Sequence, residues 1–311
     1  MSKEAWVGDG GWLSAHLFHQ GDLSTVLVDL VGPLTGELRA RSLADRSFFL
    51  RYWDGGPHIR LRVLPRDPSV AAEAARLIED RAGAYFDRHP SPDVLGQEAY
   101  LRSAREIGAW EGVAPTELMY PNNSVRFIPY VREHGRYGSG KAIEAVEEHF
   151  TESSALALSV LRSEPGRHRR ETAVLCYLML SWFLASGDVR ALAWRQLAKA
   201  PPSADAARAL YERQRPQVLT LAAGMHKAAR GWTALPAGST VRQWASSVSR
   251  VVDVLRTHHH EGDGRPPSAE SVADLCAHLF ANRIGVRIDA EGSLRYLVAR
   301  AITEPAALEG A

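Results

Sequence analysis

The sequence predicts an α+β protein, in which an antiparallel, sheet-rich N-terminal part is packed on a largely helical C-terminal part. Three observations support this class. Short runs of alternating polarity in the first third indicate strands, and the Asp-Gly-Gly-Pro at residues 54–57 indicates a tight turn between two of them. The second half instead carries long amphipathic patterns with helical spacing. No internal repeat or long linker divides the 311 residues, so we expect a single domain over residues 1–311.

The predicted elements alternate at first and then become helical. Four strands are expected, at residues 12–18, 47–53, 58–64 and 125–131. Two helices are expected among them, at residues 23–38 and 68–89, and Gly32 and Pro33 interrupt the first. Later helices are predicted at residues 141–161, 170–185, 204–228, 241–257 and 268–284. This order favours an antiparallel α+β layer followed by helices.

The bulk composition excludes several classes of protein. A hydrophobic content of 45% and a charged content of 23% are typical of a soluble globular chain, and the net charge of +1 indicates neither a nucleic acid nor a membrane partner. No apolar run reaches membrane-spanning length, and residues 1–11 lack an apolar signal core. Cys176 and Cys276 lie in apolar helical patterns, so we expect buried thiols in a cytoplasmic protein. Nothing in the sequence indicates a metal or another cofactor, and His258, His259 and His260 are interpreted as an exposed run.

The strand at residues 58–64 has an unusual composition. Alternate residues of a strand point to opposite faces, so His58, Arg60 and Arg62 share one face and the apolar residues between them share the other. Two guanidinium groups and an imidazole repel each other unless they share an anionic or strongly hydrogen-bonding group. The face is therefore either a binding surface or a salt-bridged outer face.

Two further polar segments precede a strand and a helix. Asn122 and Asn123 come before the predicted strand at 125–131, where asparagine is first a turn residue and only then a candidate ligand-binding residue. The glycine-rich loop at residues 133–140 comes before the helix expected to begin at Lys141, whose free N–H groups can bind anions or polarise a carbonyl group. Arg136 in this loop either reaches a ligand or pairs with Glu133.

The last candidate segment lies near the end of the helix predicted at residues 268–284. His278 and Asn282 are four residues apart, so they are neighbours on one face, and Asn282 is a candidate partner for the imidazole. Arg283 lies in the last turn, where a cation complements the helix dipole, and Gly285 is a natural C-cap.

Taken in order, these segments resemble a known family. The resemblance rests on Phe48-Phe49-Leu50-Arg51-Tyr52, Pro57-His58-Ile59-Arg60-Leu61-Arg62, Arg136-Tyr137-Gly138, Glu148-His149-Phe150 and His278-Leu279-Phe280-Ala281-Asn282-Arg283. These motifs look like those of the C-terminal domain of class I lantibiotic dehydratases, which also occurs alone as the thiopeptide-type bacteriocin biosynthesis protein. The resemblance covers nearly the whole chain, and it is strongest with the thiopeptide pyridine synthases.

The resemblance implies one of two reactions on a ribosomal precursor peptide, and neither needs a cofactor. In the first, two dehydroalanines of a leader-bearing peptide undergo a formal [4+2] aza-cycloaddition, and loss of water and of the leader peptide gives a pyridine. In the alternative, a stand-alone subunit of a split dehydratase eliminates glutamate from glutamylated Ser or Thr. The arginines and the late histidine of the elimination branch correspond to Arg60, Arg62, Arg136 and His278.

The resemblance also implies roles for individual residues. His278, Tyr52, Tyr137 and His134 are the expected proton-transfer groups, and Arg60, Arg62 and Arg136 are expected to polarise amide carbonyls or to bind carboxylates. The expected substrate-binding residues are Trp53, His58, Asn122, Asn123 and Asn282. The expected partner is the precursor peptide, whose leader docks in a separate groove by adding a strand to a sheet edge. Other maturation enzymes or a second copy of the chain are further candidate partners, and a non-enzymatic peptide-binding scaffold is the third alternative.

Overall fold

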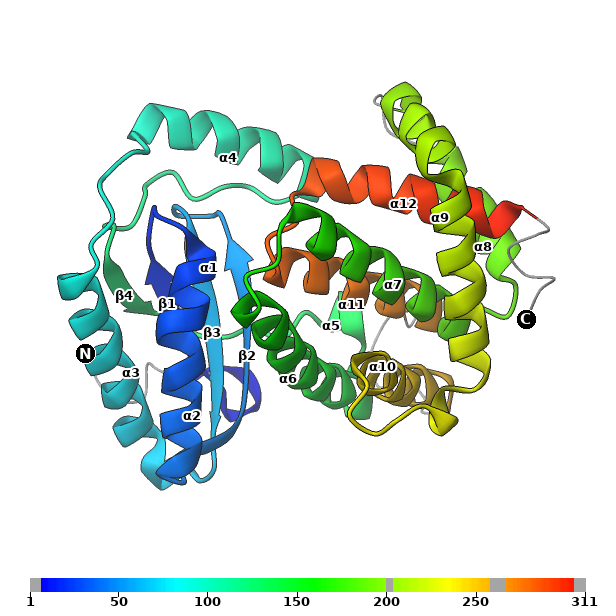
Figure 1. Ribbon diagram of the computed structural model, residues 1–311. Helices are drawn as coiled ribbons and strands as arrows, with labels where there is room; N and C mark the ends of the chain where they lie inside the picture. Colours follow the sequence, from blue (N-terminus) through cyan, green and yellow to red (C-terminus); the bar gives the residue numbers. More distant parts are fainter. Residues whose placement is uncertain (1–6, 200–203, 258–266, 305–311) are drawn as a thin grey trace. The chain divides into compact units, whose positions relative to one another are not determined.

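The computed structural model describes residues 7–199, 204–257 and 267–304, and the chain divides into two compact units, Met1–Arg132 and Glu133–Ala311. The first unit contains the sheet and the second is helical (Figure 1). The α+β class, with a sheet-rich N-terminal part and a helical C-terminal part, is therefore confirmed. The assignment of residues 1–311 to one domain stays a prediction.

The sheet of the first unit has four antiparallel strands in the order β2-β3-β1-β4. They are β1 (Leu13–Phe18), β2 (Ala44–Tyr52), β3 (His58–Pro65) and β4 (Ser124–Phe127). With the intervening helices this is the order of a split βαβ unit, β-α-β-β-α-β. The hairpin between β2 and β3 is present as predicted, and Gly55 and Gly56 take the positive φ angles of +81° and +107° that its turn requires. The last strand is shorter than the predicted 125–131.

The helices of the first unit are a long composite helix and two others. The composite helix consists of α1 (Leu23–Val26), the π-helical η3 (Leu27–Val31) and α2 (Gly32–Ala40). It continues through Pro33 because the wider π turn lies just before the proline, which has no N–H to donate. The others are α3 (Ala71–Arg88), preceded by the 3₁₀ turn η4 (Pro68–Val70), and α4 (Gln97–Glu111). A 3₁₀ turn η2 (Asp9–Gly11) precedes β1.

The two faces of the sheet differ in chemistry. One face carries Leu17, Ile59, Leu61 and other buried apolar residues, and α2 and α3 cover it. Residues that pair across antiparallel strands share a face, and the pairs His16–Arg60 and Phe48–Arg62 show that the other face is polar and aromatic. The sequence pattern of the strand at 58–64 therefore predicted the two faces correctly.

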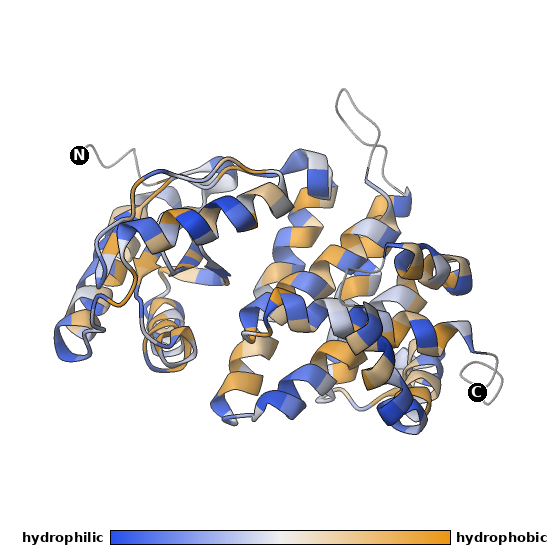
Figure 2. Ribbon diagram, turned by 90° about the horizontal axis from the view of Figure 1, so that it is seen from above, coloured by the Kyte–Doolittle hydropathy of each residue, from blue (hydrophilic) through white to orange (hydrophobic). Residues whose placement is uncertain are grey.

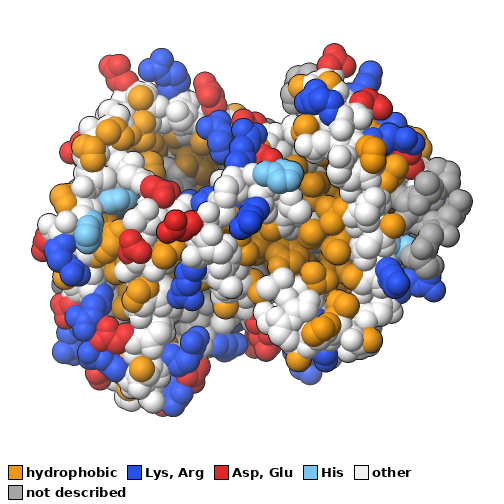
Figure 3. All heavy atoms as spheres, in the orientation of Figure 1, with side chains coloured by type: hydrophobic (Ala, Val, Ile, Leu, Met, Phe, Trp, Pro, Cys, Tyr) orange, Lys and Arg blue, Asp and Glu red, His pale blue; other side chains and the backbone are white. Residues whose placement is uncertain are grey.

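The second unit is a bundle of helices around an apolar core. Its helices are α5 (His134–Tyr137), α6 (Lys141–Arg162), α7 (Arg167–Ala185), α8 (Val189–Ala198), α9 (Ala204–Arg230), α10 (Thr240–Thr257), α11 (Ala269–Arg283) and α12 (Ile288–Thr303), with a 3₁₀ turn η5 (Trp232–Ala234). Apolar residues follow one side of most helices and polar residues the other (Figure 2). In the view of Figure 3, hydrophobic side chains gather on part of the second unit.

The helical predictions were correct for five long segments and missed others. The predicted helices at 141–161, 170–185, 204–228, 241–257 and 268–284 correspond to α6, α7, α9, α10 and α11. Helices α4, α8 and α12 were not predicted. Cys276 is buried and Cys176 half-buried, and neither forms a disulfide. Within the described ranges, no helix combines the length and the hydropathy needed to cross a membrane, and His258, His259 and His260 lie outside those ranges.

Candidate functional site

The polar face of the sheet brings four of the predicted residues together. Strand register places Tyr52 opposite His58, and the adjacent β1 places His16 opposite Arg60. The rings of His16 and His58 stack, with centroids 4.8 Å apart, and Arg62 Nη1 lies 3.4 Å from His16 Nε2. We call His16, His58, Arg60, Arg62 and Tyr52 the sheet-face cluster. His16 was not predicted as a site residue, although the strand pattern put it on this face.

Both histidines of the sheet-face cluster are held neutral. Burial, together with the charges of Arg62 and Arg60, lowers the pKa of His16 far below its ordinary value. Burial likewise lowers the pKa of His58 to about 3, against a smaller opposing effect of the Gly56 carbonyl. That carbonyl oxygen, 2.8 Å from His58 Nδ1, can only accept, so the ring proton is on Nδ1 and Nε2 is an acceptor. His58 Nε2 is buried and has no hydrogen-bond partner among the described residues.

Arg60, Tyr52 and Trp53 form the aromatic edge of the cluster. The Arg60 guanidinium lies 3.3 Å from the centre of the Tyr52 ring, and Trp53 stacks on Tyr52 at 5.5 Å. The cation is thus held against a π face. A hydrogen bond from Thr116 N to Asp54 fixes the adjacent hairpin turn, at 2.6 Å.

Asn122 and Asn123 hold two loops of the first unit together. Asn123 has the left-handed φ of +53° expected for a turn asparagine, and its side-chain oxygen lies 3.1 Å from His19 Nδ1 and accepts from Ser91 N at 2.9 Å. The Asn122 oxygen accepts from Gln20 N at 2.9 Å, and its amide nitrogen donates to the Ser91 carbonyl at 3.0 Å. These bonds support the turn interpretation, and the substrate-binding role of both residues stays a prediction.

The glycine-rich loop of the second unit presents three of the predicted residues. His134 and Arg136 are exposed in α5, and Tyr137 in the same turn is buried against Phe150. Arg136 Nε lies 3.1 Å from Glu133 Oε2, which is the pairing that the sequence offered as the alternative to ligand binding. Burial raises the pKa of Tyr137 well above its ordinary value, so its hydroxyl is a hydrogen-bond donor and not an anion.

The imidazole of His278 on α11 is held by a carboxylate from α12. His278 Nδ1 lies 2.8 Å from Glu291 Oε2, and the His278 side chain is 29% exposed whereas that of Glu291 is 5% exposed. Asn282, the partner suggested by helical spacing, is half-buried on the same helix, and its role in substrate binding stays a prediction. Glu291 was not predicted, because α12 itself was not recognised.

Glu291 is in turn part of a buried ionic network. Its Oε1 accepts from Arg295 Nε at 2.8 Å, and Arg295 Nη1 donates to Asp274 Oδ1 at 2.5 Å. Trp182 Nε1 donates to the same Asp274 oxygen at 2.8 Å. Burial opposes ionisation of Glu291, but the hydrogen bond from His278 and the charge of Arg295 outweigh it and lower the Glu291 pKa. We call His278, Glu291, Arg295 and Asp274 the carboxylate network.

Arg283 is a functional candidate that the sequence interpretation missed. It occupies the last turn of α11 and Gly285 caps the helix as expected, but Arg283 is 0% exposed and does not face solvent. Its guanidinium lies 5.2 Å from the centre of the Phe150 ring, and burial lowers its pKa to about 10. Its position in the last turn agrees with the sequence interpretation, but its burial was not predicted: Arg283, seven residues after Cys276, continues the buried face of the helix.

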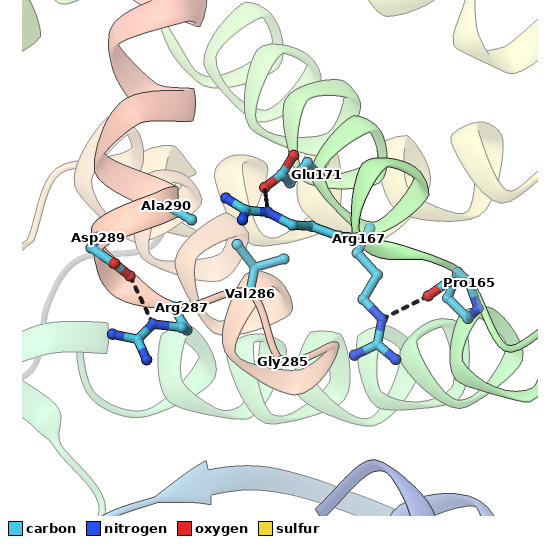
Figure 4. Close-up of a pocket in the computed structure, with 9 residues that line it drawn as sticks. Pro165, Arg167, Glu171, Gly285, Val286, Arg287, Asp289 and Ala290 are labelled. Carbon is cyan, nitrogen blue, oxygen red and sulfur yellow. Dashed lines mark hydrogen bonds and ion pairs between the residues drawn. The ribbon is translucent and has the colours of Figure 1, made fainter. Parts of the chain in front are cut away.

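A separate hollow of about 340 Å³ opens between the start of α7 and the turn that joins α11 to α12 (Figure 4). Arg167 lies 2.7 Å from Glu171, and Arg287 lies 3.1 Å from Asp289 (Figure 4). The charged side chains that line this hollow are therefore largely paired with one another. None of the predicted site residues is among the described residues that line the hollow. The described part of the chain also holds no group of three or more His, Cys, Asp and Glu side chains able to bind a metal ion.

The predicted site residues thus fall into separate sets. Tyr52, His58, Arg60 and Arg62 share one sheet face with Trp53 beside them, and Asn122 and Asn123 lie in a turn of the same unit. The second unit holds His134, Arg136 and Tyr137 in one loop and His278 and Asn282 on one helix. Each set is complete within its own unit.

Comparisons with known proteins concern the family and the fold of the chain. Residues 12–302 match the model of a family described as "Lantibiotic biosynthesis dehydratase C-term". Among solved structures, the pyridine synthase TbtD from thiomuracin biosynthesis is similar at a TM-score of 0.77 and 19% identity, over 95% of this chain and 98% of that chain. The structure of TsrL is similar at a TM-score of 0.59 and 18% identity, over 94% of this chain and 94% of that chain.

The tRNA-dependent lantibiotic dehydratase MibB from Microbispora sp. 107891 has a TM-score of 0.62 and 20% identity, over 97% of this chain and 28% of that chain. At such identities the likeness to solved structures concerns the fold. A comparison with curated proteins gives no match.

Proposed function

The chain belongs to the lantibiotic biosynthesis dehydratase C-terminal family, and from this premise we propose that it is a peptide-modifying enzyme that forms a pyridine. The proposed reaction is a formal [4+2] aza-cycloaddition between two dehydroalanines of a leader-bearing ribosomal peptide. Loss of water and of the leader peptide then completes the aromatic ring. The observation that carries the proposal is the His278–Glu291 pair, a partly exposed imidazole held by a buried carboxylate, because this reaction consists of cyclisation and proton transfers.

The proposed chemistry balances without a cofactor. One dehydroalanine reacts as the iminol tautomer of its amide, a 2-azadiene, and the alkene of the other is the dienophile. Two carbon–carbon bonds form and close a six-membered ring that contains the amide nitrogen. The former carbonyl carbon then loses its hydroxyl as water, and the dienophile carbon loses the leader as a peptide amide. His278 Nε2 moves protons in the tautomerisation and in both losses, and Tyr52, Tyr137 and His134 are the other candidates.

The arginines have a supporting role in this proposal. Arg60 and Arg62 lie on a sheet face where water is scarce, so their hydrogen bonds to an amide carbonyl are strong. Arg136 on its exposed loop is the third candidate. Holding two alkenes in near-attack geometry supplies several kcal/mol of the barrier reduction, of the roughly 7–11 kcal/mol that full alignment can give.

The proposed partner is the precursor peptide in the cytoplasm, where it is made. The sheet order leaves β2 and β4 as edge strands, to which an extended leader segment can add. Other maturation enzymes and a second copy of the chain remain candidate partners.

Glutamate elimination is the second candidate function. It is supported by the presence of all four corresponding residues, Arg60, Arg62, Arg136 and His278, and by the fold likeness to a lantibiotic dehydratase. In that reaction the arginines bind glutamate carboxylates in bidentate fashion and His278 is the base. Arg136 and Arg62 already contact Glu133 and His16, so a glutamate would have to displace these contacts. The need to displace these contacts supports cycloaddition over elimination. The fold likeness to a pyridine synthase, over 95% of this chain and 98% of that chain, also supports cycloaddition.

Mass spectrometry of two peptides tests the proposal. The purified protein is incubated with a leader-bearing peptide that contains two dehydroalanines, and separately with a glutamylated peptide. The expected result is a core peptide lighter by water and leader, with no change in the glutamylated peptide. Glutamate release from the second peptide without change in the first would overturn cycloaddition in favour of elimination. Binding of both peptides without turnover would identify a scaffold.

A further inference from the structure

We propose that Glu291 is a positioning residue that holds His278 with its proton on Nδ1, so that Nε2 is the nitrogen that exchanges protons with the peptide. This inference rests on the proposed function for its activity readout, although the tautomer itself is a property of the free protein. Arg295 and Asp274 hold Glu291 in place.

The two carboxylate oxygens of Glu291 have different partners. Glu291 Oε2 lies 2.8 Å from His278 Nδ1, and Oε1 accepts from Arg295 Nε at 2.8 Å. An ionised carboxylate can only accept, so the proton between Glu291 and the imidazole is on Nδ1. Nε2 then carries the lone pair of the neutral ring, as in other histidines that a carboxylate orients.

The two side chains of the His278–Glu291 pair differ in their exposure to solvent. The Glu291 side chain is 5% exposed and the His278 side chain 29% exposed, so the carboxylate is shielded while part of the ring can meet a peptide. A carboxylate in such surroundings also offsets the positive charge that the ring acquires when Nε2 takes a proton.

The Glu291 carboxylate is itself held by Arg295, which in turn donates a hydrogen bond to Asp274. Glu291 precedes Arg295 by four residues on α12, the favourable order for such a pair, and Arg295 also donates to Asp274 on α11. The network therefore joins the two helices at the point where the imidazole projects. An isolated carboxylate would have several rotamers, but this one has both oxygens engaged.

The experiment compares Glu291→Gln with Glu291→Asp. Glutamine has one acceptor oxygen, so its NH₂ group must face either His278 or Arg295, whereas aspartate keeps two acceptors on a shorter side chain. ¹⁵N NMR of the imidazoles, with His278 assigned from His278→Gln, reports the tautomer in alkaline buffer without any substrate. We expect the Nδ1–H tautomer in the wild type and a gain of the Nε2–H tautomer in Glu291→Gln.

The kinetic readout separates positioning from a structural role. With the dehydroalanine peptide we expect kcat to fall on the order of 10²-fold in Glu291→Gln with little change in KM, and part of it to return in Glu291→Asp. Asp289→Asn, which removes an exposed carboxylate two residues earlier on the same helix, is the matched control and keeps wild-type activity.

A wild-type ring that carries its proton on Nε2 overturns the inference, and so does a kcat in Glu291→Gln that equals the wild-type kcat. The wild-type spectrum needs no substitution, so it decides the question even when a variant does not fold. If no peptide is cyclised, the NMR result still stands and only the proposed function fails.

Discussion

The sheet-face cluster and the carboxylate network both contain histidine and arginine, but only the second contains carboxylates. In the cluster, His16 and His58 stack beside Arg60 and Arg62, and burial together with these cations lowers the pKa of both rings. In the network, His278 bonds to Glu291. Histidines surrounded by cations stay neutral acceptors, whereas a histidine on a carboxylate can take up a charge and return it.

The difference suggests that the two regions have different roles: the sheet-face cluster provides hydrogen-bonding groups, and His278 of the carboxylate network transfers protons. A neutral His58, whose Nε2 lone pair is buried, is an acceptor and a poor proton carrier. In the proposed reaction His278 is the proton-transfer group, and Glu291 holds its ring.

The largest effect is expected for His278→Gln. The variant lacks the proton-transfer group of the proposed reaction, so kcat should fall by about 10²- to 10⁴-fold, while the precursor peptide still binds. Steady-state kinetics with the dehydroalanine peptide and a peptide-binding isotherm measure the two quantities.

The comparison between the two histidines needs the matching substitution in the sheet-face cluster, His58→Gln. His58→Gln should retain much more of kcat, since glutamine can still hydrogen-bond to a substrate. The exposed His168→Gln is the control for general effects of losing an imidazole. If His58→Gln loses as much kcat as His278→Gln, the proposed division between acceptor and proton carrier is wrong.

The second prediction concerns acid stability of the sheet-face cluster. The pKa of His58 is about 3 in the folded protein against an ordinary 6.5, so between these pH values the unfolded chain binds a proton that the folded chain does not. The free energy of unfolding should therefore fall as the pH falls, by at most about 1.4 kcal/mol per pH unit for this residue. Above pH 6.5 both states are neutral at this position and the effect vanishes.

Urea unfolding at several pH values measures this slope. His58→Gln keeps a donor for the Gly56 carbonyl but cannot take up a proton, so its slope should be smaller than that of the wild type by about 1.4 kcal/mol per pH unit at most. His168→Gln is again the matched control. A slope in His58→Gln equal to the wild-type slope would show that His58 titrates normally and that the cluster does not exclude charge.

The two regions also differ in how far the sequence could reveal them. Strict alternation and a turn with two glycines predicted the hairpin and the shared face of His58, Arg60 and Arg62, because a strand's pattern is local. The network depends on how α11 packs against α12, and His278 and Glu291 are separated by a capping glycine and a turn. Spacing along one helix suggested Asn282 instead.

A signal for the missed helix was nevertheless present. Leu294, Leu297, Val298 and Ala301 follow helical spacing and are all buried. Glu291 lies three residues before Leu294 and so continues this apolar stripe, where a carboxylate requires a partner. Arg283 is a similar case at the end of α11. A charged residue on a predicted buried stripe is therefore the pattern that single motifs overlook.

The smallest effect is expected where a carboxylate–arginine pair is exposed, at Glu133 and Arg136. Their side chains are 51% and 52% exposed and lie 3.1 Å apart, so solvent screens the pair and its contribution to folding is about 0–1 kcal/mol. Glu133→Gln should change the free energy of unfolding by no more than this in urea titrations. Glu291→Gln should cost more, because it leaves a donor facing His278 or Arg295 in a buried network. Equal costs for the two variants would mean that burial does not distinguish the carboxylate of the network from an ordinary surface pair.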